Sequence, residues 1–338
     1  MKRVIFCVVS VIVYALGLTS GVYASDKQME TLKQLYKRPL YIPFPKSAPY
    51  SPQLATLGKK LFFDPRLSGA KNMNCASCHN PSFGFETPVA LAVGAANAKL
   101  GRHAPTTLNM AWVKPFFWDG RAKTLEDQAE GPLTAEVEMN GKFSEIVPEL
   151  KEIAEYQKWF DHLFPGKGIT RETILTAIAT YERTIVSNWS PFDRWVEGNE
   201  TAISESAMKG FVLFNGKANC VACHTGWNFT DNKFHDIGAD TEDIGRAKFE
   251  PNNPKAMHAF KTPGLRNLTQ RAPFTHNGSL SNLEAIVLHY ETGGINRPSR
   301  SVDMIPFTLT DTEREDLINF LISLTADKSE VAMPVLPN

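Results

Sequence analysis

Two short motifs constrain this chain more than any other feature of its sequence. They are Cys75-Ala-Ser-Cys78-His79 and Cys220-Val-Ala-Cys223-His224, and together they hold every cysteine after Cys7. This spacing lets two thiols reach the two vinyl groups on one edge of a porphyrin while the next imidazole comes under the iron. A zinc or redox Cys-x-x-Cys is the alternative, but no further cysteine pair completes a tetrahedral site. The sequence therefore predicts two covalently attached haem c groups.

The N-terminus has the pattern of an export signal. Met1-Lys2-Arg3 precedes an apolar run from Val4 to about Leu18, and small residues follow up to Ala24. This predicts a signal peptide over residues 1–24 and export to the periplasm. An uncleaved anchor is the alternative, although the run is short for a membrane span. No membrane span is expected after signal cleavage, and no disulfide is expected because the remaining cysteines belong to the haem motifs.

The charge of the chain argues against one class of partner. Lys and Arg number 36, Asp and Glu also number 36, and the formal net charge is zero. The sequence shows no basic patch interleaved with aromatic residues. A nucleic-acid partner is therefore not expected.

An internal repeat predicts the fold class. Gly58-Lys-Lys-Leu61-Phe62 precedes the first haem motif, and Gly210-Phe-Val-Leu213-Phe214 precedes the second. Two copies of one helix-plus-haem unit predict a mainly α protein with two cytochrome c-like domains, each around one haem. We place the N-terminal domain at residues 25–200 and the C-terminal domain at residues 201–338.

Apolar spacing and capping residues predict the helices. Before the first of them, residues 25–50 read as an irregular arm, and residues 326–338 read as a loose tail. The first predicted helix has Ser51 as its N-cap and Leu54, Leu57, Leu61 and Phe62 on one face. The other predicted helices are residues 125–129, 143–164, 169–187, 282–290 and 310–324. Thr310-Asp-Thr-Glu313 is a capping box at the start of the last one.

Five further segments are typical of one family. Their order and spacing, together with the haem motifs, resemble the bacterial di-haem cytochrome c peroxidases and their relative MauG. The segments are Phe117-Trp118-Asp119-Gly120-Arg121-Ala122, Gln128-Ala129-Glu130-Gly131-Pro132, Glu138-Met139, Tyr181-Glu182-Arg183-Thr184 and Leu265-Arg266-Asn267.

The resemblance implies a division of labour between the haems. The N-terminal haem would react with hydrogen peroxide, with His79 as its proximal iron ligand. The C-terminal haem would be a six-coordinate electron relay, with His224 as its proximal ligand.

The resemblance also implies roles around the peroxide site. Trp118 matches the tryptophan between the haems, Glu138 the distal glutamate, and Gln128 and Pro132 its pocket companions. The chemistry agrees, since O–O cleavage needs a group that takes a proton from one oxygen and returns it to the other. Without the resemblance, a residue such as Trp118 would more often be a core residue, and one such as Glu138 more often a solvated loop acid.

One departure from the family concerns the peroxide site. Peroxidases that need reductive activation carry a second histidine on a loop after the first haem motif. That position falls on or near Ala95, within the small-residue stretch 90–98. We therefore expect the first iron to be open or water-ligated when oxidised. His103, between His79 and Trp118, remains the alternative as a mobile sixth ligand.

The same histidine bears on a calcium ion. His103 stands where the family has a calcium-binding asparagine, so the Ca²⁺ between the domains is in doubt. Carbonyl groups near Arg271 and Pro273 could still contribute to such a site.

A second departure concerns the relay haem. The family's methionine ligand, counted from Pro273-Phe-Thr-His276-Asn-Gly278, falls here on Tyr290. A phenolate is a hard anionic ligand that favours the higher oxidation states of iron. Met304 or Met257 would be the ligand if Tyr290 merely packs, and His289 is a weaker candidate.

These observations favour an exported di-haem peroxidase of MauG type. Hydrogen peroxide would form a high-valent di-haem state that oxidises a partner, such as an aromatic side chain of another exported protein. One alternative is a cytochrome c peroxidase that reduces hydrogen peroxide to water with electrons from a small redox protein. The other is a non-catalytic di-haem electron carrier, which would have no use for a distal acid.

Overall fold

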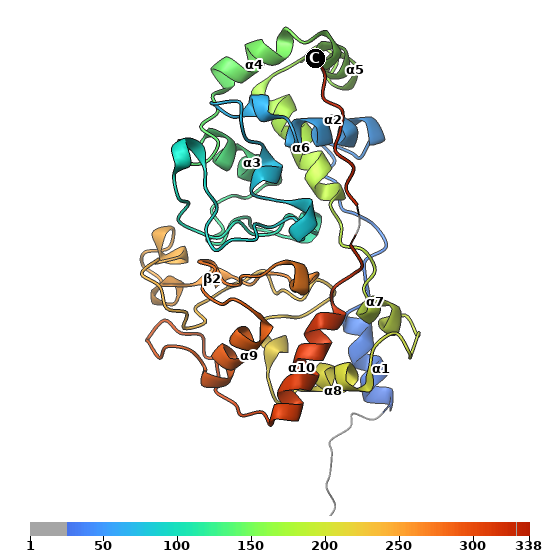
Figure 1. Cartoon of the computed structure of the whole chain (residues 1–338), viewed down its shortest axis with the longest axis vertical. Helices are drawn as coiled ribbons and strands as arrows, with labels where there is room; N and C mark the ends of the chain where they lie inside the picture. The colour runs from blue at the N-terminus through green and yellow to red at the C-terminus, as the bar shows by residue number, and fades with distance from the viewer. Residues whose placement is uncertain (1–25, 329) are drawn as a thin grey trace, which may run out of the picture.

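The computed structural model describes residues 26–328 and 330–338, which form two mainly helical lobes stacked along the long axis (Figure 1). The predicted signal peptide lies outside the described residues. The N-terminal lobe contains α2 (Pro52–Phe62), α3 (Leu125–Thr134), α4 (Phe143–Lys151), α5 (Ala154–Leu163) and α6 (Arg171–Thr184). The C-terminal lobe contains α7 (Pro191–Val196), α8 (Glu205–Asn215), α9 (Leu283–Thr292) and α10 (Asp311–Ser323), and α1 (Asp26–Leu35) packs beside it.

Regular strand is scarce, so the prediction of a mainly α fold is confirmed. Strands β1 (Phe234–His235) and β2 (Phe260–Lys261) pair antiparallel within the C-terminal half. The connections contain short 3-10 turns at Pro65–Leu67, Cys75–Ser77, Pro81–Phe83, Ala95–Asn97, Met110–Trp112, Cys220–Ala222, Arg246–Lys248, Pro254–Ala256 and Leu268–Gln270.

The helices begin at the predicted capping residues. The Ser51 side chain accepts a hydrogen bond from the Leu54 N–H at 3.0 Å, and Thr310 forms the predicted capping box with Glu313. Two expectations were wrong. The predicted helix 143–164 is broken at Ile153, whose backbone is extended, into α4 and α5. Helix α3 continues past Gly131-Pro132 to Thr134.

A glycine sets the central helix crossing of each lobe. In the N-terminal lobe, a Cβ on Gly58 would lie 1.9 Å from the Ala177 carbonyl oxygen of α6. In the C-terminal lobe, a Cβ on Gly210 would lie 2.0 Å from the Asp316 carbonyl oxygen of α10. The α2–α6 and α8–α10 pairs are therefore equivalent, and the internal repeat extends from sequence to packing.

A second repeat lies where the lobes meet. Residues 103–122 and 261–280 follow the same backbone course, and equivalent positions are the same number of residues apart. Asn109 (φ 63°) and Asn267 (φ 59°) each begin a 3-10 turn. Antiparallel bridges then close two hairpins, Phe116 to Ala122 and Phe274 to Leu280. Trp118 and His276 occupy equivalent positions at the two hairpin tips.

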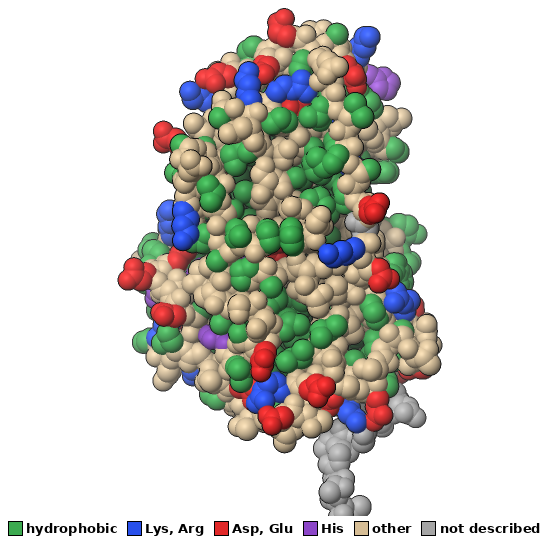
Figure 2. Space-filling model, viewed as in Figure 1, with side chains coloured by type: hydrophobic (Ala, Val, Ile, Leu, Met, Phe, Trp, Pro, Cys, Tyr) green, Lys and Arg blue, Asp and Glu red, His purple; other side chains and the backbone are tan. Residues whose placement is uncertain are grey.

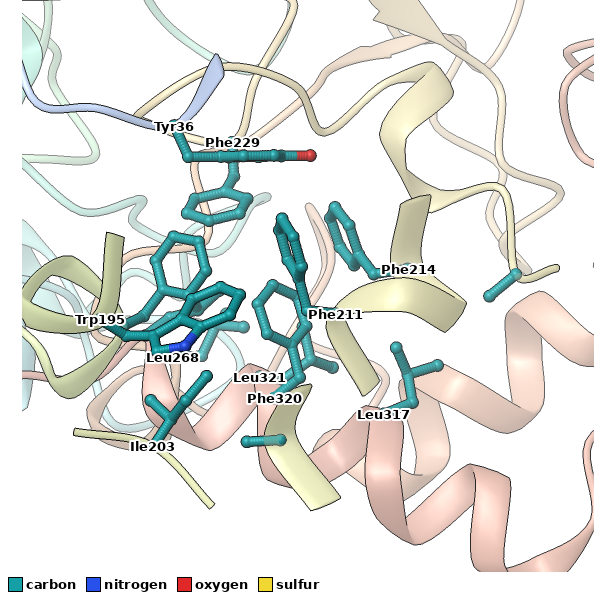
Figure 3. Packing of buried hydrophobic residues seen from close by; sticks show 14 of the residues in the cluster. Tyr36, Trp195, Ile203, Phe211, Phe214, Phe229, Leu268, Leu317, Phe320 and Leu321 are labelled. Carbon is teal, nitrogen blue, oxygen red and sulfur yellow. The ribbon is translucent and has the colours of Figure 1, made fainter. Parts of the chain in front are cut away.

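The ends of the described chain cross between the lobes. Tyr36, just after α1, is fully buried in the C-terminal core and stacks on Phe229 at a centroid distance of 4.9 Å (Figure 3). At the other end, Val331 packs against a cluster of the N-terminal lobe, and the Lys60 ammonium donates to the Val335 carbonyl at 2.6 Å. The expected irregular arm and loose tail were thus wrong in part.

The linker between the lobes also contributes to the C-terminal core. Phe192 and Trp195 of α7 are buried with Phe211 of α8 and Phe320 of α10. The predicted domains 25–200 and 201–338 follow the chain, whereas the packing assigns residues 26–36 and 191–196 to the C-terminal lobe.

The charged side chains and the length of the helices can be compared with the sequence expectations. On the face drawn in Figure 2, Lys and Arg side chains are scattered among Asp and Glu, without an extended basic area. Within the described part of the chain, no helix is both long and apolar enough to cross a membrane.

Candidate haem and peroxide site

The two Cys-x-x-Cys-His motifs form the same local structure. Each begins with a 3-10 turn, and the histidine N–H donates to the first cysteine carbonyl at 2.9 Å, from His79 to Cys75 and from His224 to Cys220. This fold brings the two cysteines and the histidine of each motif to the wall of one cavity. The four cysteines of the described chain are free of disulfide bonds, as expected.

The lining residues of both cavities suit a haem c, because each wall combines two cysteine thiols with one histidine. The N-terminal cavity has a volume of about 550 Å³ and is lined by Cys75, Cys78 and His79. The C-terminal cavity has a volume of about 160 Å³ and is lined by the second motif. Burial lowers the pKa of both motif histidines, which favours the neutral imidazole that iron binds. His224 Nδ1 lies 2.9 Å from the Phe229 carbonyl, so it donates there and leaves Nε2 for a metal.

One face of α3 lines the N-terminal cavity. Gln128 and Pro132 are one helical turn apart, and both reach the cavity together with Leu125 and Ala129. Thr124 caps the helix through a hydrogen bond from the Asp127 N–H at 3.1 Å. The structure thus brings Gln128 and Pro132 together on the wall that also holds Glu138.

Glu138 is placed to handle protons. Its carboxyl group is half-buried in the cavity wall and makes no hydrogen bond to the described residues. Burial raises its pKa above the ordinary value of 4.5, and the nearby Arg121 guanidinium opposes that rise. Arg121 stacks over the Phe117 ring at 3.5 Å, which orients it along the same wall. A carboxyl group with this pKa can take up and release a proton under mild conditions.

Residues 90–98 form the loop where some peroxidases carry a second histidine that blocks the peroxide site, and this loop lies against Glu138. The Ala95 N–H donates to the Glu138 carbonyl at 2.7 Å. A Cβ on the neighbouring Gly94, which lines the cavity, would be 2.1 Å from the Val137 carbonyl oxygen. Only glycine fits this close approach, and residues 90–98 place no histidine beside the cavity.

His103 lines both cavities, but its two ring nitrogens face partners within the protein. Its Nδ1 lies 3.1 Å from both the Val89 and the Ala90 carbonyl oxygens, so it donates to them. Its Nε2 is fully covered and faces Glu86 Oε1 at 3.4 Å. Glu86 in turn pairs with Arg271 of the C-terminal lobe at 2.6 Å. His103 would have to leave this buried position to become the mobile sixth ligand considered above.

Trp118 lines both cavities. Its indole N–H donates to the His103 carbonyl at 2.8 Å, which fixes the ring. The hairpin tip needs the left-handed backbone of Phe117 (φ 68°) and Gly120 (φ 69°). Gly131 of α3 leaves room for the Phe117 ring, which would be 2.9 Å from a Cβ there. The indole is therefore fixed between the two sites.

Two candidate relay ligands share the C-terminal cavity. Tyr290 of α9 and Met304 both line it, and the Tyr290 hydroxyl has no hydrogen-bond partner among the described residues. Burial raises the pKa of Tyr290, so only a cation such as a metal would hold it as phenolate. His289 Nε2 is occupied by the Ile237 carbonyl at 2.9 Å, and Met257 is absent from the cavity lining.

Sequence reasoning assigned no role to several polar residues at the cavities, and three of them are buried or half-buried there. Glu182 of α6 lines the N-terminal cavity with Oε2 unpartnered, and burial raises its pKa to about 8. Lys261 lines both cavities, and His276 lines the C-terminal one. Aligning residues 103–122 with 261–280 would have found Lys261 and His276, because they occupy the positions equivalent to His103 and Trp118.

Comparison with known proteins agrees with this geometry. Residues 52–201 match the model of the di-haem cytochrome c peroxidase family, and residues 207–325 match that of cytochrome c. Two cytochrome c-type domains, and the family recognised from the sequence, are therefore confirmed.

The curated relatives point the same way. The methylamine utilization protein MauG of Methylorubrum extorquens is 45% identical over 322 residues, 94% of this chain and 91% of the relative. The cytochrome c551 peroxidase of Nitrosomonas europaea is 31% identical over 328 residues, 96% of this chain and 91% of the relative.

A solved structure extends the likeness to three dimensions. The crystal structure of a MauG-like protein associated with microbial copper homeostasis superimposes with a TM-score of 0.80 at 29% identity, covering 86% of this chain and 95% of that one. Membership of the family implies two haem c groups and hydrogen peroxide as substrate. The chain belongs to the di-haem cytochrome c peroxidase family and is a haem-dependent oxidoreductase.

Proposed function

We propose that this peroxidase is of MauG type: it reacts with hydrogen peroxide without prior reduction and uses the oxidising equivalents on a partner protein. The observation that carries the proposal is the loop 90–98. Its backbone is bonded to Glu138, and it offers small side chains where a plugging ligand would stand. An open distal face needs no activating conformational change.

The residues of the N-terminal cavity would have different roles in the reaction with hydrogen peroxide. The haem supplies the redox chemistry, with Cys75, Cys78 and His79 holding it. Glu138 would take a proton from one oxygen of hydrogen peroxide and return it to the other, which would leave as water once two electrons have been supplied from the haems for O–O cleavage. Gln128 and Pro132 shape the wall beside it, and the Arg121 guanidinium opposes the rise that burial causes in the pKa of Glu138.

The residues between the cavities would connect the two sites. Trp118 is fixed by its hydrogen bond to His103 and lines both cavities, so its π system is placed to carry electrons between them. Tyr290 would bind the C-terminal iron as phenolate and favour its higher oxidation states. The substrate would be an aromatic side chain of another exported protein, and both proteins would meet in the periplasm after removal of residues 1–24.

A second candidate function rests on Met304. Met304 also lines the C-terminal cavity, and a thioether ligand would favour ferrous iron. The protein would then take electrons from a small redox protein and reduce hydrogen peroxide to water. A Tyr290→Phe variant separates the two candidates, because only a tyrosine-ligated haem changes its EPR and visible spectra.

Adding one equivalent of hydrogen peroxide to the all-ferric holoprotein, without reductant, tests the proposal. The resting EPR spectrum should contain one high-spin and one low-spin signal. Stopped-flow spectra should then change at both haems as soon as peroxide is mixed. Two low-spin signals, together with a reaction that starts only after prior reduction, would contradict the proposed MauG-type function. They would support the second candidate function, in which a small redox protein supplies the electrons.

A further inference from the structure

Lys261 is a basic side chain at the boundary of the lobes that has no anionic partner among the residues the structure describes. It belongs to β2 of the C-terminal lobe and lines both cavities. Its ammonium donates to the Pro115 carbonyl of the N-terminal lobe at 2.7 Å and lies 5.8 Å from the Phe116 ring. Among the described residues, no carboxylate forms an ion pair with it.

An ammonium group in this position needs more than one carbonyl. It has three N–H donors, and the Pro115 carbonyl accepts only one of them. Burial lowers the pKa of Lys261 to about 7, so the charged form is costly here unless an anion compensates it. The remaining donors are therefore available to an acceptor inside the cavities.

The repeat at the lobe boundary allows the surroundings of Lys261 to be compared with those of the equivalent residue, His103. The backbone N–H of Lys261 donates to the Trp118 carbonyl at 2.8 Å, and the backbone N–H of His103 donates to the His276 carbonyl at 2.8 Å. The two basic residues thus occupy equivalent places in the two halves. His103 faces a protein carboxylate, that of Glu86. No carboxylate of the described part of the chain occupies the equivalent place beside Lys261, so a carboxylate of a ligand could bind there.

The cofactor carries the matching group. Each haem c has two propionate carboxylates, and an ammonium–carboxylate hydrogen bond is among the stronger polar contacts in proteins. We propose that Lys261 binds a propionate of the N-terminal haem, so that a residue of the C-terminal lobe holds the cofactor of the other lobe. The N-terminal haem is favoured because the ammonium is turned towards Pro115 and Phe116, and Phe116 lines that cavity alone. The inference rests on the family and is independent of the MauG-type reading.

The electrostatic consequence can be measured. A cation paired with a propionate stabilises ferrous relative to ferric iron, because it offsets negative charge near the haem. A Lys261→Met variant should therefore raise the ferric-to-ferrous ratio of the N-terminal haem at a fixed potential about tenfold, which is ~59 mV for one electron. Lys261→Gln should act in the same direction, and Lys261→Arg should stay close to the parent protein.

EPR-monitored redox titration of the holoprotein resolves the two haems without peroxide or a partner. The matched control is Lys248→Met, since Lys248 reaches the N-terminal cavity but is exposed to water. Pyridine haemochrome assays verify that each variant carries two haems, and Lys261→Gln serves if Lys261→Met does not fold.

Three results would overturn the inference. One is an unchanged N-terminal potential in both neutral variants. Another is a shift confined to the C-terminal haem. The third is a parent potential that varies with chloride concentration at constant ionic strength, which would assign the Lys261 site to an anion from solution. The peroxide experiment described above would be unaffected by any of them.

Discussion

At the scale of single residues, the acid of the N-terminal cavity is the most direct test of peroxide chemistry. Replacing Glu138 by Gln keeps the shape of the side chain but removes its ability to take a proton. We expect the second-order rate constant for hydrogen peroxide to fall by about 100- to 10,000-fold. Glu136→Gln is the matched control, because Glu136 is exposed on the same loop.

The pH dependence of the same reaction follows from the pKa of Glu138. The working base is the carboxylate, and burial raises the pKa above 4.5. The rate constant of the parent protein should therefore fall as the pH decreases through a value above 4.5, and the fall should be absent in Glu138→Gln. An equal fall in both proteins would assign the titration to another group, such as Glu182.

The sequence could predict the residues whose spacing along the chain determines what they can bind. The haem motifs fix two thiols and one imidazole locally, and the structure places both sets on cavity walls. The sequence did not indicate a role for Lys261. That role depends on which carboxylates of the described residues lie near its ammonium group in three dimensions. The position of His103 also depends on partners remote in sequence, such as Glu86, so its buried contacts could not be predicted from spacing.

At the scale of elements, the two glycine crossings provide a stability test. In an exposed helix, Gly→Ala stabilises by about 1 kcal/mol. Gly58→Ala and Gly210→Ala should instead destabilise their own lobes by about 1–3 kcal/mol, because the new Cβ meets a backbone carbonyl oxygen. Denaturant unfolding of the holoprotein, followed by absorption and by helical circular dichroism, measures the change.

The control for Gly58→Ala is Gln53→Ala, at an exposed position of the same helix. The free energy of unfolding should stay within about 0.5 kcal/mol of the parent value there. A stabilised Gly58→Ala variant would mean that α2 and α6 can separate without loss, and that the crossing does not depend on glycine.

Capping and apolar spacing predicted most helices because both act within a few residues. The start of α10 at Thr310 illustrates this, since its cap and its partner Glu313 are three residues apart. The break between α4 and α5 and the helix α1 were missed for a different reason. Both depend on packing against distant parts of the chain. Ile153, at the break, is buried in the N-terminal core, and Tyr36, just after α1, is buried against Phe192 and Phe229.

At the scale of the whole molecule, the crossing of the chain ends joins the lobes. The first described helix packs with the C-terminal lobe, and the last residues run along the N-terminal lobe (Figure 1). Hydrogen bonds add to this link, since Arg246 donates to the Asp119 carbonyl at 2.7 Å beside Trp118. The indole between the sites is therefore positioned by both lobes, and a loss of contact between them should disturb it.

The buried ion pair between Glu86 and Arg271 tests whether the lobes unfold as one unit. Both side chains are almost fully buried, at 4% and 5% exposure, and the pair spans the boundary at 2.6 Å. Glu86→Gln leaves the Arg271 guanidinium without its carboxylate, which should cost about 3–5 kcal/mol. The double variant Glu86→Leu/Arg271→Met removes both charges and should recover most of that loss, since apolar replacements of buried pairs are often neutral.

The way the two lobes unfold then decides between two roles of this pair. If the pair couples the lobes, Glu86→Gln should split the unfolding curve into two transitions, each following one haem, while the double variant restores a single transition. The double-mutant cycle gives the coupling energy between the two positions. If instead every variant unfolds in one step with additive losses, the crossed chain ends and the hydrogen bonds between the lobes hold them together without this pair, and the ion pair acts only within the local packing around His103.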